Sequence, residues 1–133
     1  MNTNANITAI GIGALFPIQL SSNSSGKTGW YPAYGDPQLI EDNIKAIILY
    51  EIGQRLRQED FGTLLTSVLE EPNTLALTFL IRKYLKDAFD KYESRISIKK
   101  ISATHQSAKI YMLIEYTIED LNKESFIEAQ YNL

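Results

Sequence analysis

Hydrophobic residues recur at helical spacing in the first half of the chain and at alternate positions in the second half. Between Asp36 and Tyr50, isoleucines three and four residues apart form one apolar stripe, which predicts an amphipathic helix. Asp36 and Pro37 suit its start, because the carboxylate can cap free N–H groups and proline loses no hydrogen bond in the first turn. We expect the buried stripe to comprise Ile40, Ile44, Ile47, Ile48, Ile52 and Leu56.

Two more helices are expected after this one. Gly53 interrupts the stripe, so either the helix ends near it or another backbone segment comes close. Asp60, Phe61 and Gly62 are typical of a turn, and a short apolar helix over residues 63–69 would end before the next proline. A wide apolar face then predicts a third helix over residues 74–92.

The apolar period then changes to two, which predicts strands. Ile96 and Ile98 alternate with polar residues, whereas Ile101 breaks this parity, which indicates a bulge or a strand end. The most regular alternation covers residues 109–118, where even-numbered apolar side chains share one face. A last strand is expected over residues 125–131.

Helices followed by strands predict an α+β fold, with three helices packed on a small antiparallel or mixed β-sheet formed by the C-terminal third. A chain of 133 residues suits a single domain with one core. Within it we expect an N-terminal segment with a Ser/Gly-rich loop over residues 1–35, a helical part over residues 36–92 and a sheet part over residues 93–133.

The first 35 residues show little periodicity. Residues 1–6 are polar and expected to be frayed, and residues 21–35 are rich in Ser, Gly and Pro, so the ordered body should start near Asp36. Gly26, Lys27 and Thr28 match the end of a phosphate-binding loop, but the glycine needed five residues earlier is a serine and turn residues follow. A surface loop is the favoured interpretation.

Composition excludes several classes of function. The chain is 44% hydrophobic and 22% charged, with a formal net charge of −3, which is typical of a folded globule and offers no basic footprint for nucleic acid. It has no cysteine, which suits a reducing cytoplasm. The apolar stretch over residues 9–20 lacks a basic leader and is too short to span a bilayer, so we expect no secretion signal and no membrane contact.

Candidate chemistry is sparse. His105 is the only histidine and has no cysteine or second histidine as a partner, so we expect no metal site, no cofactor and no catalytic histidine. A small cell-wall glycosidase would need two carboxylates across a cleft and remains the enzymatic alternative. The carboxylates available to it are Glu70, Glu71, Glu93, Glu115, Glu119 and Asp120.

Aromatic and cationic residues near predicted boundaries point instead to binding. Trp30, Tyr31 and Tyr34 could form a ligand platform, but packing within or between chains is the favoured interpretation. Arg55 and Arg95 adjoin element boundaries, and Glu93 lies two residues from Arg95. Such a guanidinium can tie a helix end to the first strand or offer a bidentate fork to a partner.

Several short motifs follow one another along the chain: Phe16-Pro17, Gly53-Gln54-Arg55, Phe61-Gly62, Leu69-Glu70-Glu71-Pro72 and Glu93-Ser94-Arg95-Ile96. Their order resembles the baseplate wedge family of contractile tails, which includes the sheath initiator of T-even-like phages and counterparts in type VI secretion and extracellular injection particles. The similarity covers roughly residues 10–131. Two differences stand out: Gln54 replaces a family glutamate and Ser94 replaces a family proline.

The resemblance implies a structural, non-enzymatic subunit that links the baseplate wedge to the first ring of sheath and templates sheath assembly by β-strand addition. It implies sheath and wedge subunits as partners, with tube or hub proteins as further candidates, and six copies per particle assembled in the bacterial cytoplasm. An α+β interaction module with an unrelated partner is the other alternative. The partner-binding residues expected are Gly53, Arg55, Glu93, Arg95, Phe126, Ile127, Ala129 and Tyr131.

Overall fold

The computed structural model describes residues 3–22, 24–68, 75–107 and 109–132 and has an α+β architecture, as the sequence predicts. The chain divides into two compact units, Met1–Asn43 and Ile44–Leu133, which we describe separately. The single domain expected from the chain length stays a prediction. No helix in the described part of the chain is both long and apolar enough to cross a membrane.

The N-terminal unit is more ordered than the sequence predicts. It contains helix α1 and two small antiparallel sheets, β1 with β4 and β2 with β3. The expectation that ordered structure starts near Asp36 is therefore wrong. These elements are α1 (Thr3–Ile10), β1 (Ile12–Ala14), β2 (Leu20–Ser22), β3 (Thr28–Trp30) and β4 (Pro32–Tyr34).

Close packing explains the missed N-terminal helix. Ala9 and Ile10 in α1 are buried, although only a few apolar residues mark the segment. Gly35 has a φ of 61°, and a Cβ there would lie 2.7 Å from the backbone of Asn6. A glycine therefore allows the chain after β4 to pass directly against α1, a contact that no periodic pattern reveals.

Helix α2 (Gln38–Leu49) crosses the boundary between the two units and begins as predicted. The Asp36 carboxylate accepts a hydrogen bond from the N–H of Gln38 at 2.9 Å, which confirms the cap. The apolar stripe continues in sequence beyond the helix end, and there the prediction is wrong, because Ile52 is 41% exposed and Leu56 is 97% exposed. The stripe residues that are fully buried are Ile40, Ile44, Ile47 and Ile48.

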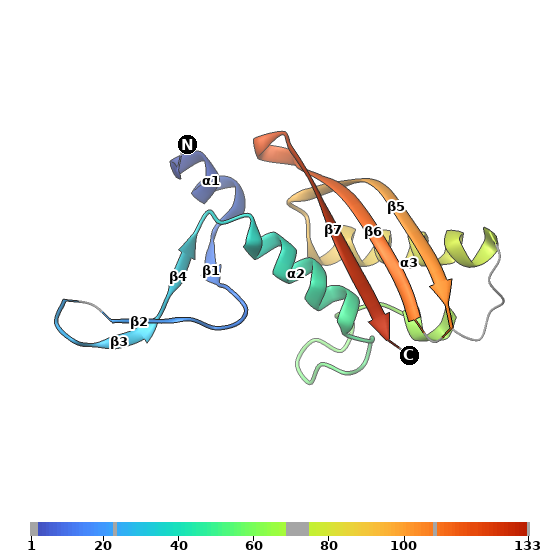
Figure 1. Ribbon diagram of the computed structural model, residues 1–133, viewed down its shortest axis with the longest axis horizontal. Coiled ribbons are helices and arrows are strands. Elements are labelled where there is room, and N and C mark those ends of the chain that lie inside the picture. Colours follow the sequence, from blue (N-terminus) through green and yellow to red (C-terminus); the bar gives the residue numbers. More distant parts are fainter. Residues whose placement is uncertain (1–2, 23, 69–74, 108, 133) are drawn as a thin grey trace. The chain divides into compact units, whose positions relative to one another are not determined.

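The C-terminal unit is built on a three-stranded antiparallel sheet in the order β5-β6-β7, and helix α3 packs on it through β5 (Figure 1). The predicted short helix is a 3-10 helix, η1 (Leu65–Val68), and residue 69 lies outside the described residues. A second 3-10 turn, η2 (Glu119–Leu121), joins β6 to β7. The remaining elements are α3 (Leu75–Tyr92), β5 (Ile96–Gln106), β6 (Lys109–Ile118) and β7 (Lys123–Asn132).

The sheet confirms the predicted alternation. In β6, every even-numbered side chain from Ile110 to Ile118 is buried. The pairing of β5 with β6 shifts register between Ile98 and Lys100, which is the irregularity that the parity of Ile101 indicates. Strand β7 pairs with β6 in continuous register from Lys123 to Asn132.

Candidate partner-binding site

A short segment after α3 forms a charged corner. The Glu93 side chain is 1% exposed and accepts hydrogen bonds from the Arg95 guanidinium, 2.6 Å from Nε to Oε1 and 2.5 Å from Nη2 to Oε2. The backbone N–H of Arg95 also donates to Oε1 at 3.3 Å. The N–H of Glu119 donates to the Arg95 carbonyl at 3.1 Å, so the corner is tied to the end of β6.

This geometry favours one of the two roles considered for Arg95. Its bidentate fork is occupied by Glu93, so the guanidinium links the end of α3 to the start of β5. The hydrogen bonds to Glu93 raise the pKa of Arg95 above its usual value, while partial burial opposes this effect. A buried carboxylate that is bound in this way fixes the corner, because losing its partner would strand a charge away from water.

Residues 50–63 form a second structured region, a loop whose ends pair with each other. Thr63 N–H donates to the Tyr50 carbonyl at 3.0 Å, and Ile52 N–H donates to the Thr63 carbonyl at 3.2 Å. Gly53 has a φ of 98°, and its N–H donates to the Glu59 carbonyl at 2.6 Å. The loop is thus closed by its own backbone, and Gly53 supplies a conformation that other residues rarely adopt.

Gln54 supplies a side-chain acceptor in this loop. The Gln54 side-chain oxygen accepts a hydrogen bond from the N–H of Glu51 at 3.1 Å. The Glu51 carboxylate in turn accepts a hydrogen bond from the Thr66 hydroxyl in η1. Gln54 therefore performs a local structural role that needs an oxygen but no charge.

A row of aromatic rings connects the loop to the charged corner. The Arg55 guanidinium carbon lies 4.5 Å from the ring centre of Phe61, which is the geometry of a cation–π contact. Phe61 contacts Tyr92 edge to face with ring centres 4.9 Å apart, and Tyr92 directly precedes Glu93. The two arginine motifs are therefore joined through Phe61 and Tyr92.

Sequence reasoning missed the aromatic part of this arrangement. Tyr50, Phe61 and Tyr92 were assigned to helix ends and a turn, and only the rings' contacts make them one cluster. An ion pair between Lys91 and Asp60, 2.9 Å long, adds a second link between α3 and the loop. The available signal was Phe61 itself, a large apolar residue inside an otherwise polar turn.

The predicted residues of the last strand do not share one face. Ile127 is buried, Ala129 and Tyr131 are half-buried on the same side, and Phe126 points to the other face with 62% exposure. Burial, with a smaller contribution from the Glu51 carboxylate, raises the pKa of Tyr131. The end of β7 therefore lies near the start of the loop, whereas Phe126 belongs to the outer face of the sheet.

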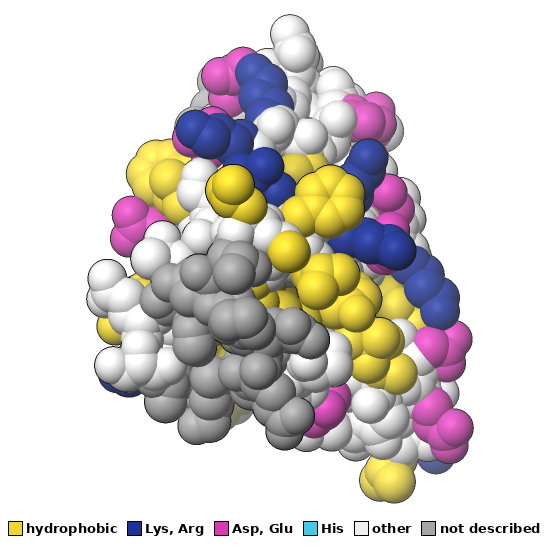
Figure 2. Space-filling model, turned by 90° about the vertical axis from the view of Figure 1, so that its right-hand side faces the viewer, with side chains coloured by type: hydrophobic (Ala, Val, Ile, Leu, Met, Phe, Trp, Pro, Cys, Tyr) yellow, Lys and Arg dark blue, Asp and Glu magenta, His cyan; other side chains and the backbone are white. Residues whose placement is uncertain are grey.

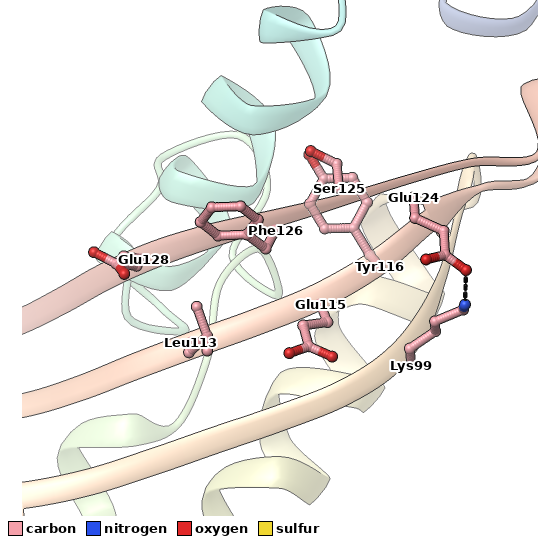
Figure 3. Close-up of a pocket in the computed structure, with 8 residues that line it drawn as sticks. All are labelled: Lys99, Leu113, Glu115, Tyr116, Glu124, Ser125, Phe126 and Glu128. Carbon is pink, nitrogen blue, oxygen red and sulfur yellow. Dashed lines mark hydrogen bonds and ion pairs between the residues drawn. The ribbon is translucent and has the colours of Figure 1, made fainter.

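That outer face carries a shallow pocket with several carboxylates (Figure 3). Its volume is about 400 Å³, and Glu115, Glu128 and Phe126 are among its lining residues. A glycosidase acid needs a buried or crowded carboxyl group, whereas Glu124 and Glu128 are exposed and Glu124 is paired with Lys99.

Several other sequence candidates belong to the N-terminal unit. Thr28 begins strand β3 of a hairpin and not a helix, so the Gly-Lys-Thr triplet has no phosphate-binding context. Trp30, Tyr31 and Tyr34 are exposed in the N-terminal unit. Among the residues that the structure describes, no group of three His, Cys, Asp or Glu side chains is arranged for a metal ion. Glu70 and Glu71 lie outside the described residues.

The model of the baseplate wedge protein gp25 family matches residues 36–123. The chain belongs to this family. The match confirms the resemblance inferred from the ordered motifs and includes the loop, the aromatic cluster and the charged corner. It ends at the first residue of β7.

One relative and two solved structures resemble this chain. Baseplate protein W of Escherichia phage P2 is 30% identical over 67 residues, which are 50% of this chain and 58% of that protein. The anti-feeding prophage baseplate contains a chain with a TM-score of 0.69 and 16% identity, covering 85% of this chain and 89% of that one. A Geobacter sulfurreducens protein described as a tail lysozyme has a TM-score of 0.65 and 22% identity, and the match covers 71% of this chain and 87% of that one. At these identities, the two structures show a shared fold.

Proposed function

We propose that this chain is a structural subunit that links the baseplate wedge to the first sheath ring of a contractile particle and templates sheath assembly by β-strand addition. Its membership of the baseplate wedge protein gp25 family carries the proposal. The edge strand β7 supports it, because ten consecutive residues pair with β6 on one side and no described strand pairs on the other. A regular open edge is the structure that an added strand requires.

The last strand suits this role in its side chains as well. An incoming sheath strand would pair with the β7 backbone, and its inward side chains would continue the row formed by Ile127, Ala129 and Tyr131. Phe126 would contact the added strand on the outer face. Main-chain hydrogen bonds would then set the register, and alternate side chains would set selectivity.

The loop and the charged corner are the proposed wedge contact. Gly53 shapes the loop, Arg55 rests on Phe61, and Glu93 holds Arg95 at the corner. Because both arginines are positioned by contacts within the unit, less side-chain entropy should be lost when a partner binds them.

The proposed role requires no catalysis. The carboxylates of the outer sheet face lack the environment of a glycosidase acid, and the tail lysozyme description belongs to a structure that shares the fold. We further propose that six copies assemble into the particle baseplate in the bacterial cytoplasm, with tube or hub proteins as additional neighbours. Purified protein should leave peptidoglycan intact even at high concentration.

Co-purification tests the assembly role. The full chain, tagged and expressed in particle-producing cells, should recover both sheath and wedge subunits. Arg95→Lys keeps the charge but cannot hold Glu93 with a planar fork, so the corner should lose its shape and recovery of wedge subunits should fall more than that of sheath subunits. Recovery of neither class from cells that are making particles would contradict the proposal.

Two neighbouring proline substitutions test strand addition. Adjacent N–H groups in a strand point to opposite sides, so one of Glu128→Pro and Ala129→Pro removes a bond to β6 and the other removes an outward donor. Urea unfolding identifies the variant that lacks only the outward donor, because it loses less stability than the other. That variant should recover fewer sheath subunits and as many wedge subunits as the unchanged protein. Unchanged sheath recovery would exclude strand addition at β7.

A further inference from the structure

The opposite edge of the sheet carries a groove that the assembly role at β7 does not use. It lies between α3 and β5, has a volume of about 290 Å³ and is lined by Arg82, Lys86, Ile98, Lys99, Lys100 and Ile101. Four of these residues are cationic and none is acidic, in a chain with a formal net charge of −3. The groove is therefore a positively charged surface on a protein whose net charge is negative.

The Arg82 side chain is anchored by a hydrogen bond to β5. Its Nε donates a hydrogen bond to the Ile101 carbonyl at 2.7 Å, so the guanidinium is anchored on β5. Carboxylates bind a guanidinium through paired N–H groups, and a side chain that is already positioned loses less entropy when it binds one. Lys99 is paired with Glu124, and Lys100 lies opposite Glu115 in the β5–β6 register, so Arg82 and Lys86 of α3 are the main cations of the groove.

Apolar surface continues the groove along α3. Phe79 precedes Arg82 by three residues, which places both on one helix face, and Leu75 lies one turn before Phe79. Phe79 is 69% exposed and Leu75 is 90% exposed. Figure 2 shows hydrophobic side chains gathered beside Lys and Arg side chains on this side of the molecule.

The edge of β5 is unsuited to regular strand addition. Its register shifts between Ile98 and Lys100, and lysines with a bulge are devices that protect sheet edges from pairing. Binding here would therefore rest on side chains. A nucleic acid would need a longer basic track, whereas this groove accommodates only a few residues beside two isoleucines.

We propose that the groove between α3 and β5 binds a short segment of another protein chain in which glutamate or aspartate alternates with aliphatic residues. The carboxylates pair with Arg82 and Lys86, Lys100 adds a further attraction, and the aliphatic side chains cover Ile98 and Phe79. Because the rest of this chain is net acidic, it repels such a segment elsewhere and directs it to the groove.

A labelled peptide, acetyl-Glu-Leu-Glu-Leu-Glu-amide, provides the test with the full chain. Its affinity should fall by about tenfold or more for the double variant Lys86→Glu and Lys100→Glu, because two attractions become repulsions. The control is Lys83→Glu with Lys123→Glu, which changes the same charge outside the groove and should alter affinity by less than about twofold. Circular dichroism confirms that both double variants are folded.

Backbone amide shifts locate the bound peptide. The acidic peptide should shift the amide signals of Ile98 and Ile101. An analogue with glutamine in place of each glutamate should shift neither signal. Three results would overturn the proposal: shifts of β7 amides without shifts of β5 amides, an equal loss of affinity in both double variants, or no binding at about 1 mM peptide. The last result would indicate that the cations only protect the sheet edge from pairing. A thymidine tetranucleotide that binds more tightly than the peptide would overturn it in favour of nucleic acid.

Discussion

The loop over residues 50–63 and the β2–β3 hairpin both contain glycines and aromatic residues, but Phe61 in the loop and Trp30 in the hairpin are placed differently. Phe61 in the loop is 5% exposed, whereas Trp30 in the hairpin is 65% exposed. The loop closes on its own backbone around an inward ring. The hairpin has three register pairs, and its Leu20–Trp30 pair faces solvent. Two segments of similar turn-forming composition thus differ in whether their aromatic ring points inward or toward solvent.

The largest expected effect comes from Gly62, where the loop closes. It has a φ of 118°, and a Cβ would lie 2.3 Å from the Tyr50 carbonyl oxygen, which accepts the closing hydrogen bond from Thr63. Gly62→Ala should lower the free energy of unfolding by about 3–5 kcal/mol in urea titration. Gly53→Ala is the matched control, because its Cβ meets nothing within 4 Å and only backbone strain of about 1–2 kcal/mol remains. Equal losses would mean that the close approach is unimportant.

Removing the inward ring tests the comparison directly. Phe61→Ala deletes the contacts with Tyr50, Tyr92 and Arg55 and should lower the free energy of unfolding by about 3 kcal/mol. Trp30→Ala, at the exposed ring of the hairpin, should change it by less than about 0.5 kcal/mol. Denaturant unfolding of both variants gives the ratio, and similar losses would show that the hairpin ring is also structural.

A smaller effect is expected at the charged corner. Glu93→Gln leaves Arg95 with a neutral acceptor in place of a buried carboxylate. Because Arg95 is 31% exposed and can regain water, we expect a loss of about 1–2 kcal/mol, less than for a wholly buried pair. Thermal unfolding measures the loss, and Glu124→Gln at an exposed pair is the control. A loss no greater than in the control would contradict a structural role for the corner.

The smallest effect concerns the exposed link between the loop and α3. The hydrogen bond and charge of Lys91 hold the pKa of Asp60 below its ordinary value of 3.8. The stabilisation is therefore present above the unfolded pKa and is lost as the pH falls through the folded pKa. Carboxyl titration by NMR should show the pKa of Asp60 rising toward 3.8 in Lys91→Gln. An unchanged pKa would mean that the pair is not formed in solution.

Part of the candidate site was predictable because its signals are local. Glu93 and Arg95 are two residues apart, and Gly53 interrupts an apolar stripe, so short patterns reveal both. The contact of Phe61 with Tyr92 joins segments about 30 residues apart, and its contact with Arg55 spans the turn within the loop. No periodic pattern in the sequence predicts either contact. The basic groove was missed for the same reason, because Arg82 and Lys100 meet only when α3 packs on β5.

The sequence by itself determined the α+β class, the buried stripes of α2 and β6, the cap at Asp36 and the irregularity near Ile101. Each follows from backbone periodicity or from a side chain that bonds to its own neighbours. Tertiary structure alone decided that Leu56 is exposed, that α1 is ordered and that the two sheet edges differ. These features depend on which distant surfaces remove water from a residue, and hydrophobicity along a chain does not specify that partner.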